Sequence, residues 1–384
     1  MRINDMQRVA CKRAAAAGLP FAIWRKPFGG DFTALISTSQ PTLAPVFGGA
    51  VQPGFVMAPF VTEAGNQAWT LPADVLITES GLRYRDGSRL VETPTTEAQA
   101  TLTDPDSAIP DSLPAPEGAA PTATDRDSYM ARVARAVETI RSGACDKIVL
   151  SRVEPRDLPA DRDLLDMAEG LAALHPHAFV SLVSSGATGT WLTATPEILL
   201  ARDGHGLRTM ALAGTQWPEA GTDITRLDWP RKIIDEQALV ADYIRDAFAA
   251  EGFEGVEETA PYTVRAANLC HLRSDFRAPR GDDDVALGRL LERLHPTSAV
   301  CGMPKEPAMD FILQEEGPTR HFYTGYLGPR DLDGTTSLYV NLRSANVVGE
   351  RIYLHVGGGI VAASDPATEW QETVEKTKTI AAVL

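Results

Sequence analysis

The spacing of apolar residues along the chain predicts a protein that mixes helices and strands. In five segments the apolar residues recur every three to four positions, which is typical of helices with one buried face. The clearest one opens with Pro230 and ends near Gly252, as expected for the two ends of a helix. The predicted helices span residues 130–140, 164–174, 230–253, 285–294 and 366–383.

Short apolar runs bounded by turn residues predict strands between these helices. Asp333-Gly334 and Gly349-Glu350 are turn signals that divide residues 321–361 into three strands, and tight turns of this kind favour antiparallel pairing. The apolar stretch 14–24 is interrupted by Gly18 and Pro20, so we interpret it as a buried segment and not as a signal peptide. The other predicted strands span residues 147–152, 179–183, 191–200 with an interruption at Pro196, and 207–214.

The stretch from residue 93 to 124 is rich in Pro, Ala, Thr, Asp and Glu and has no aromatic residue. Such a segment buries little apolar area, so we expect a flexible loop. It could also mark a domain boundary, but about 90 residues before it are few for an independent sheet-rich unit. We therefore expect a single domain over residues 1–384. It comprises a less recognisable N-terminal part (1–92), the loop (93–124) and a motif-bearing catalytic region (125–384).

The composition of the chain argues against some classes of binding partner. The net charge of −15 over 384 residues argues against nucleic acid and against anionic membrane surfaces. No apolar run reaches the roughly 20 residues that a membrane-spanning helix needs. The four cysteines are scattered without metal-binding spacing, so we expect a cytoplasmic protein. A small anionic substrate remains possible where a metal ion or buried basic groups offset the negative field.

Two predicted helices carry carboxylates at informative spacings. Lys232 and Glu236 lie one turn apart, and Glu369, Glu372 and Lys376 share one face of the last helix. In most proteins such spacings belong to a solvated face with ion pairs. Here the last helix follows three consecutive glycines, at 357–359, which allow a ligand to approach the backbone closely.

Two further titratable residues border predicted strands. Lys147 opens one apolar strand, and Glu197 follows Pro196 before an apolar run. Charged residues at such positions commonly face solvent. The functional alternative is a general base and a general acid whose protonation is set by their surroundings.

Several short motifs in a fixed order resemble the chorismate-utilising enzymes. The family includes isochorismate synthase, salicylate synthase, anthranilate synthase and aminodeoxychorismate synthase. One departure is Glu236-Gln237, where members usually carry Glu-His. The motifs are Lys147–Arg152, Thr195–Leu199, Leu212–Thr215, Asn268–Leu272, Leu294–Thr297 with Gly302–Pro304, Arg320–Gly325, Leu342–Ala345, Gly357–Val361 and Glu369–Thr373 with Lys376.

The resemblance implies an α+β fold, a large antiparallel β-sandwich flanked by helices, with the site in a cleft. It implies one Mg²⁺ held by Glu236 and Glu372, with Glu369 close by through water. Arg343 and Tyr323 match residues that hold the enolpyruvyl carboxylate of chorismate. The residues assigned to substrate binding are Gly214, Thr215, His271, Ala299, Val300, Tyr323, Arg343, Gly357, Gly358, Gly359 and Lys376.

The resemblance also implies a reaction. Water attacks C2 of the chorismate ring while hydroxide leaves C4, with Lys147 as the base and Glu197 as the acid. Members that use ammonia tend to carry glutamine at the position of Lys147, and those with a nucleophilic lysine carry it where this chain has Ala213. Both positions favour formation of isochorismate.

Two alternatives remain: salicylate synthase, which goes on to expel pyruvate, and an inactive chorismate-binding protein. Ala299-Val300 resembles the pair found in isochorismate synthases. Residues 229–237 resemble the family members of the menaquinone pathway. This resemblance favours menaquinone over siderophore biosynthesis as the use of the product. We expect a monomer whose partner is its small-molecule substrate.

Overall fold

The computed structural model describes residues 2–49, 52–62, 66–87, 89–104, 109, 113–114, 118–160, 162–216, 218–219, 221–266, 269–279 and 283–384. The side chains of residues 98, 232, 266 and 269 are outside this description. Asn268 of the motif named above and the predicted role of the Lys232 side chain therefore lie outside the described residues.

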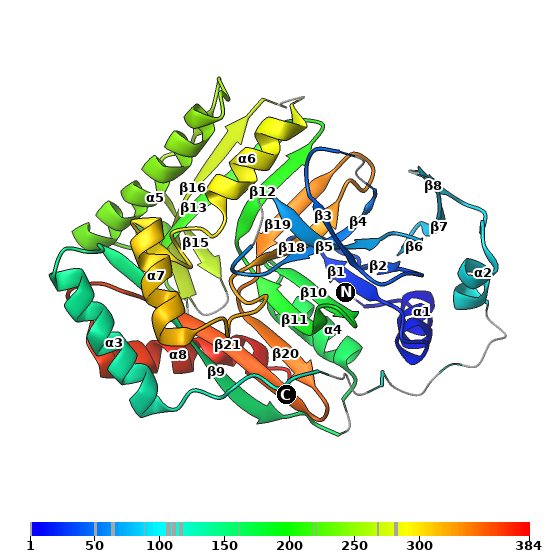
Figure 1. Cartoon of the computed structure of the whole chain (residues 1–384), viewed down its shortest axis with the longest axis horizontal. Helices are drawn as coiled ribbons and strands as arrows, with labels where there is room; N and C mark the ends of the chain where they lie inside the picture. Colours follow the sequence, from blue (N-terminus) through cyan, green and yellow to red (C-terminus); the bar gives the residue numbers. More distant parts are fainter. Residues whose placement is uncertain are drawn as a thin grey trace.

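Two antiparallel sheets form the centre of the described chain (Figure 1). The first sheet has 11 strands and the second has 10. In spatial order, the first contains β17 (Gly302–Met303), β9 (Lys147–Asp157), β21 (Arg351–Ile360), β20 (Ser344–Val348), β11 (Gly189–Thr195), β10 (Phe179–Ser185), β1 (Phe21–Arg25), β2 (Thr33–Ile36), β6 (Val75–Thr78), β7 (Gly81–Asp86) and β8 (Arg89–Val91). The second contains β14 (Glu257–Glu258), β16 (Leu269–Ala278), β13 (Gly206–Gln216), β12 (Ile198–Asp203), β19 (Thr336–Val340), β18 (Tyr326–Arg330), β4 (Gly54–Ala58), β5 (Gln67–Pro72) and β3 (Thr42–Pro45), with β15 (Tyr262–Ala266) paired to β16.

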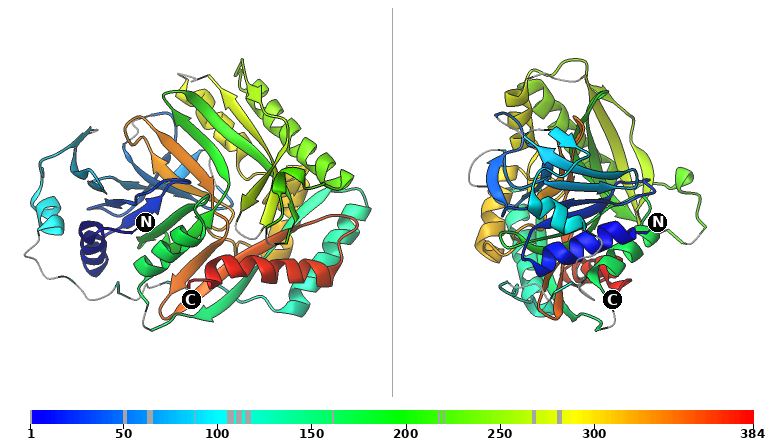
Figure 2. Two further views of the ribbon diagram at one scale, coloured as in Figure 1. Left: turned by 180° about the vertical axis from the view of Figure 1, so that it is seen from behind. Right: turned by 90° about the vertical axis from the view of Figure 1, so that its right-hand side faces the viewer.

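Helices cover the outer faces of both sheets. α5 and α6 pack on the second sheet, while α1 and α4 pack on the first. Figure 2 shows α8 and α3 side by side across the ends of β9 and β21. The α-helices are α1 (Asp5–Ala16), α2 (Glu97–Thr103), α3 (Arg126–Arg141), α4 (Leu164–Leu174), α5 (Arg231–Ala250), α6 (Asp284–Leu294), α7 (Lys305–Glu316) and α8 (Pro366–Ala381).

Alternation along the strands explains why they are buried on both faces. In β1, Phe21 and Ile23 join the core beneath the helices, whereas Ala22 and Trp24 point the other way, into the core between the sheets. Successive side chains of a strand point to opposite faces, so a strand covered on both sides reads as a continuous apolar run. The predicted β-sandwich flanked by helices is confirmed.

Two short crossings carry the chain from one sheet to the other. Pro196 and Glu197 connect β11 in the first sheet to β12 in the second. Residues 341–343 connect β19 in the second sheet to β20 in the first. The crossings lie together because β11 pairs with β20 and β12 pairs with β19.

The structure corrects three details of the predicted elements. Residues 321–361 form four strands and not three, because the chain changes sheet at residues 341–343, between β19 and β20. Residues 191–200 are two strands in different sheets, because the chain changes sheet at Pro196. The stretch 93–124 contains α2, whose start is capped by Thr96 and Gln99. The predicted flexibility of this stretch stays a prediction, since residues 105–108, 110–112 and 115–117 are outside the described part.

Both sheets contain strands from both parts of the chain. The single domain over residues 1–384 stays a prediction. Within the described residues, none of the helices has the length and apolarity that a membrane-spanning helix requires.

Candidate active site

One cavity of about 430 Å³ lies between β9, β21 and α8 on one side and β13 and α5 on the other. Every residue that the sequence analysis assigned to catalysis, substrate binding or metal binding lines this cavity. These residues are Lys147, Glu197, Gly214, Thr215, Glu236, His271, Ala299, Val300, Tyr323, Arg343, Gly357, Gly358, Gly359, Glu369, Glu372 and Lys376.

Glu197 reaches the cavity from the crossing between the sheets. Its backbone is held there, because its amide donates to Thr195 Oγ1 (3.3 Å) and its carbonyl accepts from the amide of Val340 (3.0 Å). The residue is only 4% exposed. Burial raises the pKa of Glu197 to about 7, against the opposing effects of a hydrogen bond from Thr297 and the charge of Lys147. A carboxyl group with this pKa is substantially protonated near neutral pH, which a general acid requires.

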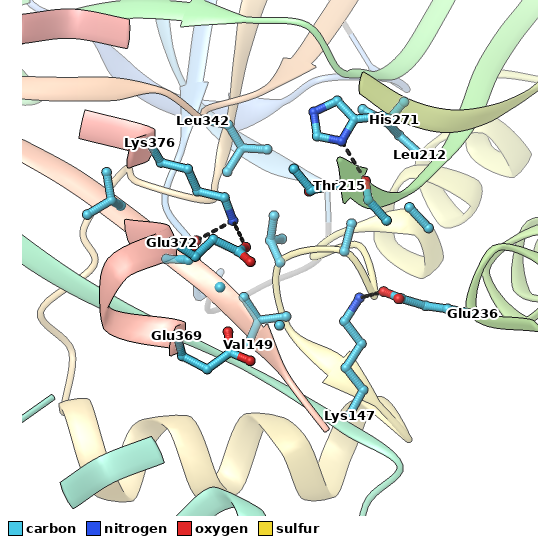
Figure 3. Close-up of a pocket in the computed structure, with 18 of the residues that line it drawn as sticks. Lys147, Val149, Leu212, Thr215, Glu236, His271, Leu342, Glu369, Glu372 and Lys376 are labelled. Atoms are coloured by element: carbon cyan, nitrogen blue, oxygen red, sulfur yellow. Dashed lines mark hydrogen bonds and ion pairs between the residues drawn. The ribbon is translucent and has the colours of Figure 1, made fainter. Parts of the chain in front are cut away.

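Lys147 enters the cavity from the first residue of β9. Its Nζ lies 2.5 Å from Oε1 of Glu236, which belongs to α5 on the opposite wall (Figure 3). The two side chains are 13% and 22% exposed. This ion pair joins the two walls at one edge of the cavity.

α8 supplies the wall on the other side of the cavity. Glu372 and Lys376 lie one turn apart, with Lys376 Nζ 2.6 Å from Glu372 Oε1 and 2.8 Å from the carbonyl oxygen of Gly357. Burial raises the pKa of Glu372, but the charge and hydrogen bond of Lys376, together with the charge of Arg343, outweigh it, and the pKa lies below its usual value. Glu369 lies one turn before Glu372 and faces the same cavity (Figure 3).

Gly357, Gly358 and Gly359 (the glycine run) lie in the part of β21 that pairs with only one neighbouring strand. Pairing of β20 with β21 ends at His355, whereas β9 continues to pair with β21 as far as Ile360. Two of the three glycines leave little space for a side chain. A Cβ on Gly357 would lie 2.5 Å from the carbonyl oxygen of Leu150, and one on Gly359 would lie 2.8 Å from Cε of Lys147.

Arg343 lies on the second crossing in a left-handed conformation, with φ of 47°. Such a conformation is costly for a residue with a side chain and is often found at functional sites. Burial lowers the pKa of Arg343, but a guanidinium keeps its charge in proteins. Tyr323 also lines the cavity, and burial raises the pKa of its hydroxyl to about 12, so it remains a hydrogen-bond donor.

The wall formed by the second sheet contains Gly214, Thr215 and His271. Nδ1 of His271 lies 2.7 Å from the carbonyl oxygen of Gly214, and burial lowers the pKa of His271 to about 4, so its ring is neutral. Gly214 has φ of 67°, and a Cβ there would lie 2.3 Å from the side chain of Ile233 in α5. Gly214 therefore allows α5 to approach β13 closely.

Gln237, the departure from the expected Glu-His pair, lies on the face of α5 that packs against β13. The side chain is fully buried and donates through Nε2 to the carbonyl oxygen of Ala211 in β13 (3.2 Å). With Gln237 facing the sheet, the preceding residue, Glu236, faces the cavity.

The carboxylates fit magnesium in their chemistry, because magnesium prefers oxygen ligands. Glu236, Glu369 and Glu372 all reach the cavity. In the part of the chain that is described, however, no three His, Cys, Asp or Glu side chains converge as a metal-binding group. Glu236 contacts Lys147, and Glu372 contacts Lys376, so binding a metal requires these carboxylates to exchange partners.

Some residues at the cavity were not predicted from the sequence. Thr297 Oγ1 donates to Glu197 Oε1 at 3.4 Å. Val149, Leu212 and Leu342 supply apolar lining. Thr297 lies within a recognised motif, but a hydroxyl in a motif does not reveal by itself which side chain it faces.

A protein-family model described as chorismate binding enzyme matches residues 60–384. The salicylate biosynthesis isochorismate synthase of Pseudomonas aeruginosa is 38% identical over 264 residues, which cover 66% of this chain and 54% of that protein. The isochorismate synthase EntC of Escherichia coli is 30% identical over 261 residues, covering 67% of this chain and 66% of that protein. These matches span about half to two thirds of the length of the relatives.

The structure of MenF, the menaquinone-specific isochorismate synthase from Escherichia coli, superimposes on this one with a TM-score of 0.80 at 24% sequence identity. The superposition covers 100% of this chain and 91% of that chain. The two proteins therefore share one fold over the whole length compared.

Proposed function

The chain belongs to the chorismate-binding enzyme family, and on that premise we propose that it interconverts chorismate and isochorismate. The observation that carries the proposal is the pairing of two proton-transfer groups across one cavity. Lys147 comes from the first sheet and Glu197 from the crossing between the sheets, and burial holds the pKa of Glu197 near 7. The relatives described as isochorismate synthases support the same reaction.

The proposed chemistry balances with one water in and one water out. The oxygen of the attacking water bonds to C2 of the ring, and its proton passes to Lys147, which must be the neutral amine at this step and not the ammonium that pairs with Glu236. The two ring double bonds shift along the ring as the bond to C2 forms, the bond between C4 and its hydroxyl oxygen breaks, and Glu197 protonates the departing hydroxide. Water is a poor nucleophile and hydroxide a poor leaving group, so both groups are needed at neutral pH.

The substrate carries two carboxylates, and the cavity offers cationic groups for them. Arg343 and Tyr323 lie together in the lining, and Lys376 faces it from α8. A guanidinium can hold a carboxylate through two parallel hydrogen bonds. We assign the enolpyruvyl carboxylate to Arg343 and Tyr323. Backbone N–H groups of the glycine run are available to the ring carboxylate.

Magnesium is the cofactor that we propose for the ring carboxylate. Glu236 and Glu372 would hold it, with Glu369 nearby, and the ion would offset the negative charge of the substrate. The residues of this chain keep their own tasks. Arg343 orients the enolpyruvyl arm, Lys147 accepts a proton and Glu197 donates one.

The lining favours isochorismate as the final product. Ala213 offers no amine that could attack the ring, and Val300 is buried in the cavity wall beside Ala299. We infer that Val300 restricts how the ring and the enolpyruvyl arm fold together, which pyruvate loss requires. The use of the product in menaquinone biosynthesis, the monomeric state and the cytoplasmic location stay predictions.

The product assay tests the proposal directly. The purified chain is incubated with chorismate and Mg²⁺ near neutral pH, the products are separated, and any pyruvate is coupled to lactate dehydrogenase. We expect isochorismate in reversible equilibrium with chorismate, without pyruvate. Pyruvate released as fast as chorismate disappears would move the assignment to salicylate synthase, and anthranilate formed with added ammonium would replace it altogether. Binding of chorismate without any product would indicate an inactive chorismate-binding protein.

A further inference from the structure

A second hollow, of about 520 Å³, lies behind the Lys147–Glu236 ion pair. We call it the outer groove. It shares Lys147, Glu236, Val361 and Ala363 with the catalytic cavity, so the ion pair forms part of the partition between the two spaces. Residues at its edge are exposed, which means that the groove opens to solvent. Beyond the four shared residues, it is bounded by Asp146, Asp235, Leu239, Val240, Ser298, Met303 and Ala362.

Ser298 is the unusual residue of the outer groove. It is only 6% exposed, and its Oγ has no hydrogen-bond partner among the described residues. A buried hydroxyl without a partner is costly, and a bound water molecule is the usual remedy where space allows. Leu239, Val240 and Met303 are apolar, so Ser298 offers a polar anchor for water on an otherwise apolar side of the groove.

The neighbours of Ser298 face the other side of the partition. Thr297 donates its hydroxyl to Glu197, and Ala299 and Val300 line the catalytic cavity. One short segment therefore touches the proposed acid, the ring pocket and the outer groove. Water held at Ser298 lies in the same space that Lys147 borders.

We propose that the outer groove is the route by which the attacking water reaches Lys147, with Ser298 holding water along it. The inference rests on the proposed function, in which a bulky dianion fills the catalytic cavity during the reaction. The opening that admits chorismate is then blocked by chorismate. The groove supplies water from the far side of the base, where it can give its proton to Lys147 as its oxygen bonds to C2.

Access to Lys147 can be measured without turnover. Acetic anhydride, a small neutral reagent, transfers an acetyl group to an amine and releases acetate and a proton. The full chain is labelled briefly in the presence of Mg²⁺, with and without saturating chorismate, and acetylation of Lys147 is quantified by mass spectrometry. If the outer groove is a second route to Lys147, saturating chorismate should leave the acetylation of Lys147 nearly unchanged. Complete protection of Lys147 by chorismate in the unaltered chain would overturn the proposal.

Blocking the groove supplies the matched comparison. Leu239 is 47% exposed at the edge of the groove on α5, so Leu239→Trp adds bulk there without disturbing the core. In this variant chorismate should cause loss of Lys147 labelling, because only the main opening remains. Asp246→Trp, on an exposed position of the same helix outside both spaces, should behave like the unaltered chain. If chorismate protects Lys147 in none of the proteins and no isochorismate forms, the proposed function has failed rather than the route.

Ser298→Ala tests the water anchor. We expect kcat to fall several-fold while KM for chorismate stays unchanged, and Ser298→Thr, which keeps the hydroxyl, should restore kcat. Loss of a merely unpaired hydroxyl would raise thermal stability and leave turnover intact. A Ser298→Ala enzyme that is more stable and fully active would show that Ser298 holds no water for the reaction.

Discussion

Burial determines what Glu197 can do. An exposed glutamate is ionised at neutral pH, whereas the buried carboxyl of Glu197 has a pKa of about 7. Its position on a crossing, fixed by hydrogen bonds to Thr195 and Val340, keeps it away from solvent but within the cavity wall. The raised pKa of Glu197 therefore depends on its buried position at the crossing as well as on its carboxyl group.

Glu197→Gln should change how stability depends on pH. Because the folded-state pKa is raised from 4.5 to about 7, the folded protein holds an extra proton between these pH values. The stabilisation linked to that proton is complete below pH 4.5 and is lost as pH rises through about 7, by at most roughly 3 kcal/mol. Denaturant unfolding at pH 5 and pH 8 should show a smaller difference for Glu197→Gln than for the unaltered chain. Equal pH dependence in both proteins would contradict the raised pKa.

Lys147→Ala and Glu197→Ala should each lower kcat by roughly 10²–10⁴-fold, the usual range for a positioned proton-transfer group. Substrate affinity should change much less, since neither residue is assigned to a carboxylate of chorismate. Lys378→Ala is a suitable control, because Lys378 is 61% exposed and lies on α8 outside the cavity lining. Near-normal turnover in either active-site variant would mean that its role is misassigned.

The residues named from the sequence motifs lie together in the structure, while their roles stay predictions. Each predicted residue lines one cavity, although Glu236 and Glu369 come from helices more than a hundred positions apart. The motifs did not reveal Ser298 or the contact of Thr297 with Glu197. These depend on which way each side chain of a turn points, and small hydroxyl residues carry no periodic signal for that.

At the scale of single elements, α8 presents Glu369, Glu372 and Lys376 on one face toward the cavity. Lys376 neutralises Glu372 when no metal is bound, so the helix does not depend on the ion to fold. The capping side chain of Asp365 and the proline at the helix start stabilise its first turn independently.

Glu372→Gln should therefore weaken Mg²⁺ binding while leaving the fold intact. Isothermal titration with Mg²⁺ measures the first effect, and circular dichroism the second. Activity of the unaltered chain should vanish in a chelator and return with added Mg²⁺. Glu375→Gln, on the same helix but outside the cavity lining, provides the control. Full activity in excess chelator would eliminate the proposed metal.

The glycines of β21 should respond differently to alanine. Gly357→Ala sets a Cβ against the backbone oxygen of Leu150, which cannot move freely, so the midpoint of thermal unfolding should drop. Gly359→Ala meets the flexible end of Lys147, so this protein should fold but lose kcat. Measuring stability and kcat for both variants separates the two effects. A stable, fully active Gly357→Ala protein would show that the strand has more room than its geometry indicates.

Element prediction succeeded where the apolar pattern is long and regular. α4 spans Leu164–Leu174, the predicted residues, and α5 begins one residue later and ends three residues earlier than predicted. α7 was missed because its buried positions include Glu316, which breaks the apolar stripe. Glu316 is buried with Arg320, an ion pair that no local pattern indicates.

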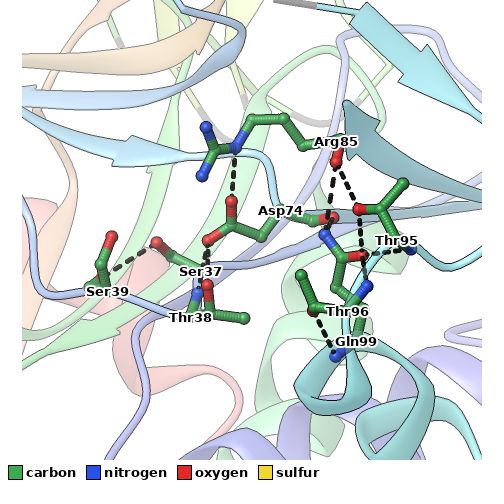
Figure 4. A network of polar contacts seen from close by, with 8 residues as sticks. All are labelled: Ser37, Thr38, Ser39, Asp74, Arg85, Thr95, Thr96 and Gln99. Carbon is green, nitrogen blue, oxygen red and sulfur yellow. Dashed lines mark hydrogen bonds and ion pairs between the residues drawn. The ribbon is translucent and has the colours of Figure 1, made fainter. Parts of the chain in front are cut away.

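At the scale of the whole molecule, the N-terminal part completes both sheets. Strands β1, β2 and β6–β8 extend the first, and β3–β5 extend the second. A polar network also ties this part together: buried Asp74 accepts hydrogen bonds from Thr38 and Arg85, and Gln99 of α2 donates to its carbonyl oxygen (Figure 4). The short N-terminal strands escaped prediction because few of them are long enough to establish a pattern.

A chain that starts at residue 125 should therefore fail to fold, even though it holds all the predicted catalytic residues. Removing the N-terminal part exposes Phe179, Trp191 and Tyr339, which the core between the sheets buries against residues such as Trp24. We expect low soluble yield and no cooperative unfolding transition, with the full chain as the reference. An active fragment that unfolds cooperatively would show that the two parts are separable.

The backbone around residues 297–300 is held from outside the site. The guanidinium of Arg320 donates to the carbonyl oxygens of Val300 and Val149, and the amides of Val300 and Cys301 both donate to Thr297. None of these bonds uses the side chains at 297–300. In evolution, then, substitution of these side chains leaves the hydrogen bonds that shape the loop in place. A lineage could change which nucleophile it admits, or whether pyruvate is lost, through a few substitutions here without having to find a new way to fold.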